Sequence, residues 1–293
     1  IKIKETEIKL WHKDVKLFEV KDTKNNSLIG YFATDLFPRE GKFAHACVVP
    51  VVASSAKSFY SDEFNVPFSV IICNFTIPTK KVPSLLSLRE AETLFHEFGH
   101  CLHATLSTSR HSSQSGTNVV WDFVETPSQF MENWLWNKEV FTKISKHYLT
   151  GKKIPGKELD NMLNSRKSQV SYDSVRQLIY TKLDLDLHTG KTNNAKEAYR
   201  KLYKMYLDFN IPVDSLFPAG FGHLVGYDAG YYSYMWALDY AHDAFSLFET
   251  AGSKNILTNK EIGMKWRNEV LEKGSTEDEM KLIKNFLGRK PSQ

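Results

Sequence analysis

The sequence predicts an α+β protein. Runs of alternating and β-branched residues are confined to roughly the first 80 positions. Almost everything after Ser87 shows apolar residues at helical spacing instead. No internal repeat and no low-complexity linker separates the two regions. We therefore expect a small N-terminal β-sheet packed beside a mainly helical region.

Polar turns such as Lys24-Asn25-Asn26 delimit the strands, which are expected at 15–20, 28–35, 45–52 and 68–75. Long amphipathic helices are expected at 170–187, 195–209, 229–248, 260–271 and 277–286. The segment Lys152-Lys153-Ile154-Pro155-Gly156 is interpreted as a loop and not as a domain boundary. A single domain is thus expected over 1–293, with its sheet at about 1–80 and its helices at about 87–290.

A further helix is expected to begin near Leu88. Ser87-Leu88-Arg89-Glu90 is typical of a capping box, in which the side chains of Ser87 and Glu90 each bond a free amide at the helix start. Apolar residues then recur at spacings of three and four: Phe95, Phe98, Leu102 and Leu106. This stripe should pack on a core and leave the opposite face of the helix towards a cleft.

The same helix carries the pentad His96-Glu97-Phe98-Gly99-His100. His96 and His100 project from one face, because residues four apart lie nearly above one another. Two imidazoles at this spacing are typical of a zinc site. Glu97 lies too far round the helix to be a ligand, yet close enough to take a proton from a water molecule at the metal. The pentad predicts metal-assisted hydrolysis, although two surface histidines on an amphipathic helix would have the same spacing.

Zinc held by two histidines needs a third protein ligand and an open position. The metzincin pattern would need glycine and histidine where this helix has His103 and Leu106, so that class is excluded. Thr126-Pro127-Ser128-Gln129 is typical of a helix start, which places Glu125 at a junction from which a carboxylate can reach another helix. Asp122 is the rival ligand. Other nearby acidic residues are expected on solvated helix faces: Glu132 and Glu139.

Longer runs carry a resemblance over nearly the whole chain: Asp35–Lys42, His96–His103, Ser115–Asn118, Asp122–Glu125, Pro127–Trp134, Phe221–Tyr234 and Gly288–Pro291. Together they resemble the thimet oligopeptidase and oligopeptidase A family of zinc metallopeptidases. Two departures stand out. Family members commonly have two glycines before the tyrosine that matches Tyr227, where this chain has only Gly226. Trp121 replaces a basic residue typical of thimet oligopeptidase, which favours the bacterial oligopeptidase A branch.

The resemblance implies a zincin-type catalytic domain with His96, His100 and Glu125 as zinc ligands and Glu97 as general base. It also implies that four residues face the substrate: His223, Tyr227, Tyr231 and Tyr234. Tyr231 and His223 suit the stabilisation of an oxyanion, which leaves Tyr227 and Tyr234 to bind substrate. Glycines at 220, 222, 226 and 230 would let this segment form a loop that closes over a peptide. Tyr231, Tyr232 and Tyr234 would equally fit an aromatic stripe that opens a helix.

Composition restricts the class of protein. A chain of 293 residues with 42% hydrophobic and 25% charged residues can bury a sizeable core. No run approaches the roughly 18 apolar residues of a membrane span, and no signal peptide is visible, so a soluble cytoplasmic protein is expected. Three cysteines, an odd number, favour reduced thiols: Cys47, Cys73 and Cys101. A net charge of +4 is too small to indicate nucleic-acid binding.

Family members also have a large helical N-terminal domain that forms the other wall of a deep channel, and the resemblance implies that this chain lacks it. The expected partners are short peptides, with the missing domain or a second copy of the chain. We expect a zinc endopeptidase for oligopeptides with one Zn²⁺ per chain. Two alternatives stay open: a dipeptidyl carboxypeptidase of the same family, or a catalytically weak peptide-binding fragment.

Overall fold

The computed structural model describes residues 1–251, 257 and 259–292. The chain divides into two compact units. Unit 1 combines Ile1–Ile154 with Asp239–Gln293, and unit 2 is Pro155–Leu238. The first boundary falls in the segment at 152–156 that the sequence places in a loop inside one domain. That both units form a single catalytic domain stays a prediction.

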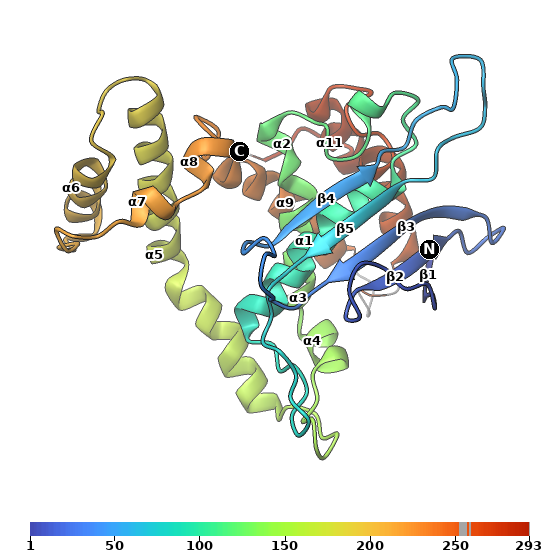
Figure 1. The fold of residues 1–293 in the computed structure, drawn as a ribbon, viewed down its shortest axis with the longest axis horizontal. Coiled ribbons are helices and arrows are strands. Elements are labelled where there is room, and N and C mark those ends of the chain that lie inside the picture. The colour runs from blue at the N-terminus through green and yellow to red at the C-terminus, as the bar shows by residue number, and fades with distance from the viewer. Residues whose placement is uncertain (252–256, 258, 293) are drawn as a thin grey trace. The chain divides into compact units, whose positions relative to one another are not determined.

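Unit 1 contains a five-stranded sheet with the strand order β1-β2-β3-β5-β4 (Figure 1). The strands are β1 (Lys2–Glu5), β2 (Lys16–Lys21), β3 (Leu28–Asp35), β4 (Cys47–Val52) and β5 (Phe68–Ile72). Neighbouring strands are antiparallel except β3 and β5, which are parallel. The strands expected from the sequence are confirmed. Strand β1 was not expected; it is only four residues long, and all its residues are exposed.

The two faces of the sheet belong to different cores, because successive side chains of a strand point to opposite faces. One face joins the main core through Val20, Phe32 and Ile71. The other face forms a smaller core through Leu17, Ala33 and Val70.

Helix α1 (Leu88–Leu106) packs against the main-core face of the sheet. The ring of Phe98 on this helix lies 5.9 Å from the ring of Phe32 on β3. A Cβ atom on Gly30 would come within 2.7 Å of Thr105 Cγ2, so glycine permits the close contact. The predicted capping box is confirmed, since Ser87 Oγ accepts from the Glu90 amide and the Glu90 carboxylate accepts from the Ser87 amide.

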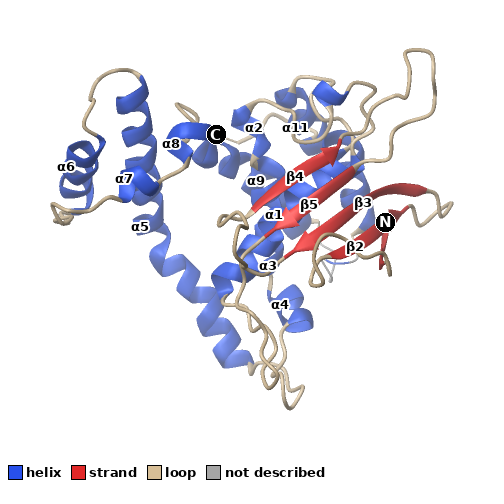
Figure 2. Cartoon of the chain, viewed as in Figure 1, coloured by secondary structure: helices blue, strands red, loops and turns tan. Residues whose placement is uncertain are grey.

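The remaining helices of unit 1 are short (Figure 2). They are α2 (Trp121–Val124), α3 (Thr126–Leu135), α4 (Lys138–Ile144), α10 (Lys260–Trp266), a π-helical turn (Arg267–Leu271), α11 (Glu279–Leu287) and the 3-10 turn η1 (Ser112–Gln114). Helix α9 (Ser233–Thr250) crosses the second boundary between the units. Aromatic rings fill the core between these helices: Phe130 stacks on Trp266 at 4.3 Å, and Trp134 contacts Phe245 and Phe248.

Unit 2 is helical. It contains α5 (Gly156–His188), α6 (Ala195–Leu207), and the single turns α7 (Phe217–Gly220) and α8 (His223–Gly226). Its core is formed by Ile179, Leu183, Tyr199, Leu202 and Tyr203. Helix α5 begins well before the predicted start at 170, because its first turns are polar and mostly exposed and so give no apolar stripe.

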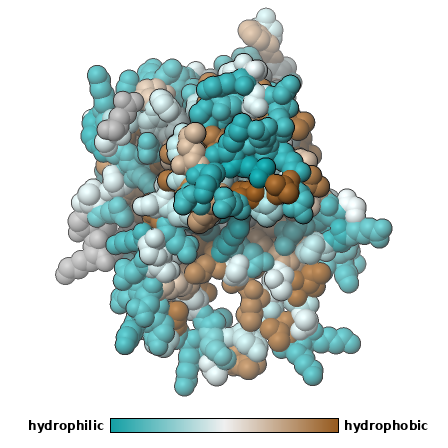
Figure 3. Space-filling view, turned by 90° about the vertical axis from the view of Figure 1, so that its left-hand side faces the viewer, coloured by the Kyte–Doolittle hydropathy of each residue, from teal (hydrophilic) through white to brown (hydrophobic). Residues whose placement is uncertain are grey.

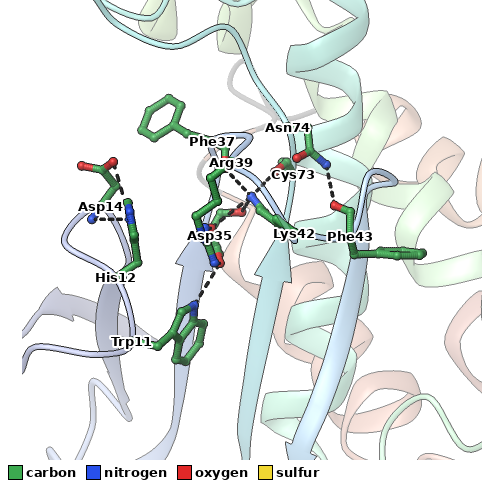
Figure 4. Close-up of polar contacts among 10 residues, drawn as sticks. All are labelled: Trp11, His12, Asp14, Asp35, Phe37, Arg39, Lys42, Phe43, Cys73 and Asn74. Atoms are coloured by element: carbon green, nitrogen blue, oxygen red, sulfur yellow. Dashed lines mark hydrogen bonds and ion pairs between the residues drawn. The ribbon is translucent and has the colours of Figure 1, made fainter.

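The turn after β3 is fixed by a buried carboxylate (Figure 4). Asp35 is only 4% exposed and accepts two hydrogen bonds from Arg39, at 2.6 and 2.7 Å. The indole of Trp11 donates a third at 3.0 Å. This pattern satisfies the negative charge of Asp35 although it is removed from water.

Lys42 fixes the same turn from within (Figure 4). Its ammonium donates to three main-chain carbonyls, those of Asp35, Phe37 and Cys73. Because Cys73 directly follows β5, Lys42 joins the ends of the two parallel strands. The run at 35–42 therefore has a structural role in this chain.

Figure 3 shows one face of the molecule, on which hydrophilic residues predominate and hydrophobic residues form smaller patches between them. Within the part of the chain that the structure describes, none of the helices combines the length and the apolar character needed to cross a membrane.

Candidate metal centre

The two histidines of the pentad and Glu125 bring three ligand atoms together. His96 and His100 lie on one face of α1, with ring centres 5.0 Å apart. Oε2 of Glu125 is 3.2 Å from Nε2 of His96 and 3.1 Å from Nε2 of His100. These three residues are the one group of potential metal ligands found in the described ranges 1–251, 257 and 259–292, and Asp122 is not part of it.

Glu125 reaches this position because it forms the junction between two helices. It ends α2 and begins α3, as the helix start at Thr126-Pro127 predicted. Glu125 is buried, with 4% of the residue exposed. The hydroxyl of Ser128, also buried, lies 2.9 Å from Oε2 of Glu125 and 2.8 Å from its main-chain oxygen, and these two acceptors share its single proton. Ser128 therefore orients the carboxylate towards the histidines.

Gly99 allows α3 to approach α1 at the level of the pentad. A Cβ atom at this position would lie 2.4 Å from the carbonyl oxygen of Pro127 and 2.6 Å from Cα of Ser128. Both are main-chain atoms of α3, so a larger residue would force the helices apart. The sequence motif contains this glycine, but its spacing alone does not reveal the contact.

Glu132 differs from the sequence expectation. Its carboxylate does not lie on a solvated helix face but is 2.7 Å from Nδ1 of His96. A carboxylate behind a ligating histidine fixes the orientation of the ring and strengthens it as a ligand. Glu139, by contrast, is partly exposed and faces Lys143 at 3.7 Å, as expected.

Opposite charges stabilise one another within this group. Burial would lower the pKa of His96, but hydrogen bonds with Glu125 and Glu132 outweigh it and raise that pKa well above its ordinary value. Burial would likewise raise the pKa of Glu125, yet the neighbouring His100 and His96 hold it well below its usual range. The geometry thus favours the ionised form of Glu125 beside the two histidines.

Glu97 is buried next to the histidines. Its side chain is 5% exposed, and its Oε2 atom has no hydrogen-bond partner among the described residues. Burial raises the pKa of this carboxyl group, while His96 and His100 oppose the shift. Burying a carboxylate oxygen without a hydrogen-bond partner costs folding free energy. Such groups are often found at functional sites.

Unit 2 brings together the four residues that the resemblance places at the substrate. His223 Nε2 lies 3.2 Å from the hydroxyl of Tyr234. The ring of Tyr227 stacks on that of Tyr234 at 5.3 Å, and the ring of Tyr231 contacts His223 at 5.3 Å. The sequence therefore identified one spatial cluster.

Tyr231 has a partner that the sequence does not reveal. It is only 7% exposed, and its hydroxyl donates to Oε1 of Gln177 on α5 at 2.8 Å. A glutamine in the middle of a long helix carries no local signal of this contact.

The backbone of this segment also differs from the expected glycine-rich loop. Single helical turns form at Phe217–Gly220 and His223–Gly226. The left-handed conformation occurs at Ala229, whose φ is 55°.

The arrangement is typical of zinc-dependent hydrolases. It combines a helix with the H-E-x-x-H pattern, a carboxylate from a second helix, and another carboxylate behind the first histidine. Comparison with known families agrees with this class. The chain matches the family model described as Peptidase family M3 over residues 1–293, and it belongs to that family.

Curated relatives carry the names of oligopeptidases. Oligopeptidase A of Escherichia coli (strain K12) is 39% identical, over 97% of this chain and 42% of its own length. The thimet-like oligopeptidase of Dictyostelium discoideum is 38% identical with the same coverage. Saccharolysin of Saccharomyces cerevisiae is 34% identical, over 97% of this chain and 40% of its own length. The chain therefore spans about two fifths of the length of these relatives.

Solved structures show a similar fold at low sequence identity. A chain described as PZ peptidase A with inhibitor 2 has a TM-score of 0.55 and 16% identity, over 86% of this chain and 39% of that one. A putative oligoendopeptidase F has a TM-score of 0.54 and 17% identity, over 88% of this chain and 40% of that one. These likenesses support the α+β architecture.

Proposed function

We propose that this chain carries the catalytic residues of a zinc-dependent endopeptidase that hydrolyses short oligopeptides. The observation that carries the proposal is the convergence of His96 Nε2, His100 Nε2 and Glu125 Oε2 beside the buried Glu97. The names of the relatives support the substrate class, since they include oligopeptidase A and thimet-like oligopeptidase.

The donor set fits zinc. Two imidazole nitrogens and one carboxylate oxygen are the ligands of many catalytic zinc sites, and they leave a fourth position for water or substrate. Glu132 bonds Nδ1 of His96, which leaves Nε2 directed towards Glu125 and His100. When bound, zinc would polarise the scissile carbonyl and lower the pKa of water towards neutrality.

Glu97 is the proposed general base. It accepts a proton from the attacking water as the water oxygen bonds to the carbonyl carbon. It then returns this proton to the amide nitrogen as the carbon–nitrogen bond breaks, which yields a carboxylic acid and an amine. The acid then loses its own proton to the amine or to solvent, which leaves a carboxylate. Its burial and the unpartnered Oε2 support this role.

Residues of unit 2 are proposed to act on the substrate. We assign His223 and Tyr231 to stabilisation of the oxyanion, and Tyr227 and Tyr234 to substrate binding. Tyr231 must first release Gln177, because a hydroxyl has only one proton to donate. His223 is already paired with Tyr234, so these two side chains should respond to substrate together.

The edge strand β4 is the proposed docking site for an extended peptide. It is the last strand of the sheet. It packs against α1, the helix that carries Glu97. An added peptide strand would bond mainly through main-chain groups, which suits the cleavage of peptides with varied sequences.

The test uses the zinc-loaded chain and a quenched fluorescent oligopeptide blocked at both ends, with mass spectrometry of the products. Internal cleavage is expected. Activity only on peptides with a free C-terminus, with release of dipeptides, would favour a dipeptidyl carboxypeptidase. Binding without hydrolysis would indicate a peptide-binding fragment and contradict the proposal.

The first prediction is that Glu97→Gln retains zinc but loses hydrolysis by about 10²–10⁴-fold, because the amide keeps the shape of the side chain and cannot accept the proton. Zinc content is measured by elemental analysis, in parallel with turnover. Near-normal turnover by this variant would show that another group serves as the base.

The cytosolic location stays a prediction. Cys47, Cys73 and Cys101 are free thiols in the structure. Relatives from Arabidopsis thaliana, however, include both a probable cytosolic oligopeptidase A and an organellar oligopeptidase A.

A further inference from the structure

A buried carboxylate on α5 holds the tyrosine segment of unit 2. Asp184 is fully buried, at 0% exposure. Its Oδ1 atom accepts a hydrogen bond from the amide of Ala229, and its Oδ2 atom accepts one from the amide of Tyr231, each at 3.0 Å. These partners are 45 and 47 positions away in the sequence, so the contact is a tertiary one.

A third donor completes the environment of Asp184. Nδ1 of His188, one helical turn later, lies 2.8 Å from Oδ1 and 2.9 Å from the main-chain oxygen of Asp184. Because both oxygens are acceptors, this nitrogen carries the proton, which the two oxygens share. Three donors thus compensate a charge that would otherwise be costly to bury.

The segment that Asp184 holds needs such support. Ala229 adopts a φ of 55°, a left-handed conformation in which the Cβ atom of alanine is crowded. A non-glycine residue persists in this region only where its surroundings fix it. Here the amide of Ala229 itself is bonded to Asp184, so the contact acts where the backbone is strained.

Helix α5 contacts the same segment a second time through Gln177, whose Oε1 atom accepts a hydrogen bond from the hydroxyl of Tyr231. Gln177 and Asp184 lie about two helical turns apart and therefore on the same face of α5. Helix α5 therefore bonds both the main chain and the side chain of Tyr231. Of these two contacts, only that of Asp184 stays in place when the hydroxyl turns to a substrate.

We propose that Asp184 is a positioning residue for peptide hydrolysis. It touches no substrate, and it sets the place of the Tyr231 side chain through the amides of Ala229 and Tyr231. The inference rests on the proposed function, because the reaction that it serves is proposed above. It also makes a separate claim, that one carboxylate determines the order of the segment around 229–231.

The kinetic test compares Asp184→Asn with Asp186→Asn. Asp186 lies two positions later on α5 and pairs with Lys182 at 2.7 Å, so it undergoes the same chemical change without contact to the segment. For Asp184→Asn we expect kcat to fall about 10–100-fold with KM within about twofold and zinc content unchanged, because a small displacement of a catalytic group has this effect. Asp186→Asn should match the unmodified chain.

A double-mutant cycle separates positioning from a general loss of structure. In a chain that already carries Tyr231→Phe, Asp184→Asn should lower kcat much less than in the unmodified chain, because the hydroxyl group that it positions is gone. An undiminished effect would show that Asp184 acts elsewhere and would overturn the proposal, as would an unchanged kcat in the single variant.

Hydrogen exchange tests the anchor independently of activity. The amide protons of Ala229 and Tyr231 should exchange faster in Asp184→Asn than in the unmodified chain. In Asp186→Asn their exchange rates should be unchanged. If the unmodified chain fails to hydrolyse peptides, the proposed function fails, while this measurement still decides whether Asp184 holds the segment. Should Asp184→Asn not fold, the smaller Asp184→Ser, which adds no bulk, takes its place with the same expectations. Unchanged exchange in the folded variant would overturn the inference.

Discussion

His96 contacts two carboxylates, and each one contacts a different nitrogen of the ring. Glu125 faces Nε2 of the ring and Glu132 faces Nδ1. A histidine ring can direct one nitrogen to a metal reliably only when the other is bonded, so Glu132 determines the rotation of the ligand. The acidic residues around the pentad therefore differ in their importance for metal binding, and removing each one should weaken zinc binding to a different extent.

The second prediction is an order of zinc affinities. Glu125→Ala should weaken zinc binding most, because it removes a ligand. Glu132→Ala should weaken it by about 10–100-fold, the usual effect of losing the partner of a ligating histidine. Competition with a chromogenic chelator measures both. Asp122→Ala and Glu139→Ala are the controls and should bind as tightly as the unmodified chain. A greater loss in Asp122→Ala than in Glu125→Ala would move the third ligand to Asp122.

The third prediction concerns the two hydroxyl groups nearest His223. Tyr231→Phe should lower kcat by roughly 10²–10³ with little change in KM, since the oxyanion that it serves exists only after attack. Tyr234→Phe should raise KM instead, because that residue is assigned to binding. Steady-state kinetics of the two variants distinguish these roles. The reverse pattern would assign the oxyanion to Tyr234 and leave Tyr231 as a structural partner of Gln177.

Among the elements, the pair α1 and α3 determines the geometry of the centre. The two histidines belong to one helix, and both carboxylates that contact them come from the other helix or its first junction. Gly99 determines how near the helices can lie. The glycine of the pentad thus determines the geometry of this centre through packing, although it has no donor atom.

The fourth prediction is that Gly99→Ala both destabilises the protein and weakens zinc binding. Overpacking of this kind typically costs about 1–3 kcal/mol, and the added methyl would push α3 away from the histidines. Gly263→Ala on α10 is the matched control, because a Cβ atom there would meet nothing within 4 Å and alanine favours a helix interior. Urea unfolding and the chelator assay report the two effects. Normal zinc affinity in Gly99→Ala would show that the helices can separate without moving the ligands.

At the scale of the whole molecule, the fold was largely predictable where the pattern is local. Runs of residues typical of strands identified β3 and β5, and a serine with a glutamate three positions later identified the start of α1. Strand β1 and the first turns of α5 were missed, because both expose most of their side chains. Exposed segments take their structure from neighbours, which a local pattern does not contain.

The site was predictable to the same limit. His96 and His100 follow from helical spacing. The proline that starts the next helix pointed to Glu125 but left Asp122 as a rival, and only the family resemblance chose between them. Glu132 and Asp184 are polar residues on helices, and the sequence around them would be the same whether they faced water or a distant amide. Their roles depend on tertiary contacts, so only the structure reveals them.

The fifth prediction links the stability of the molecule to pH through Asp35. Burial would raise the pKa of Asp35, but hydrogen bonds from Arg39, Trp11 and Lys42 outweigh it and hold the pKa well below its ordinary value. The unfolded chain therefore takes up this proton first, and stability is lost as pH falls below about 3.9 towards the lower folded value.

Asp35→Asn cannot take up that proton, so its free energy of unfolding should fall less steeply between about pH 4 and pH 2 than that of the unmodified chain. Urea titrations at several pH values measure the slope. Asp62→Asn, a change at a fully exposed side chain, is the control. Equal slopes in all three proteins would remove Asp35 from the acid response.

Lys42 gives the molecule an internal reporter of opening. Its ammonium is bonded to three main-chain carbonyls and also lies 3.0 Å from Oδ1 of Asp35, and its side chain is only 4% exposed. An acylating reagent must reach the nitrogen, so Lys42 should react far more slowly than exposed lysines. The rate at which an acyl label appears on Lys42 therefore measures how often the ends of β3 and β5 come apart in the native protein.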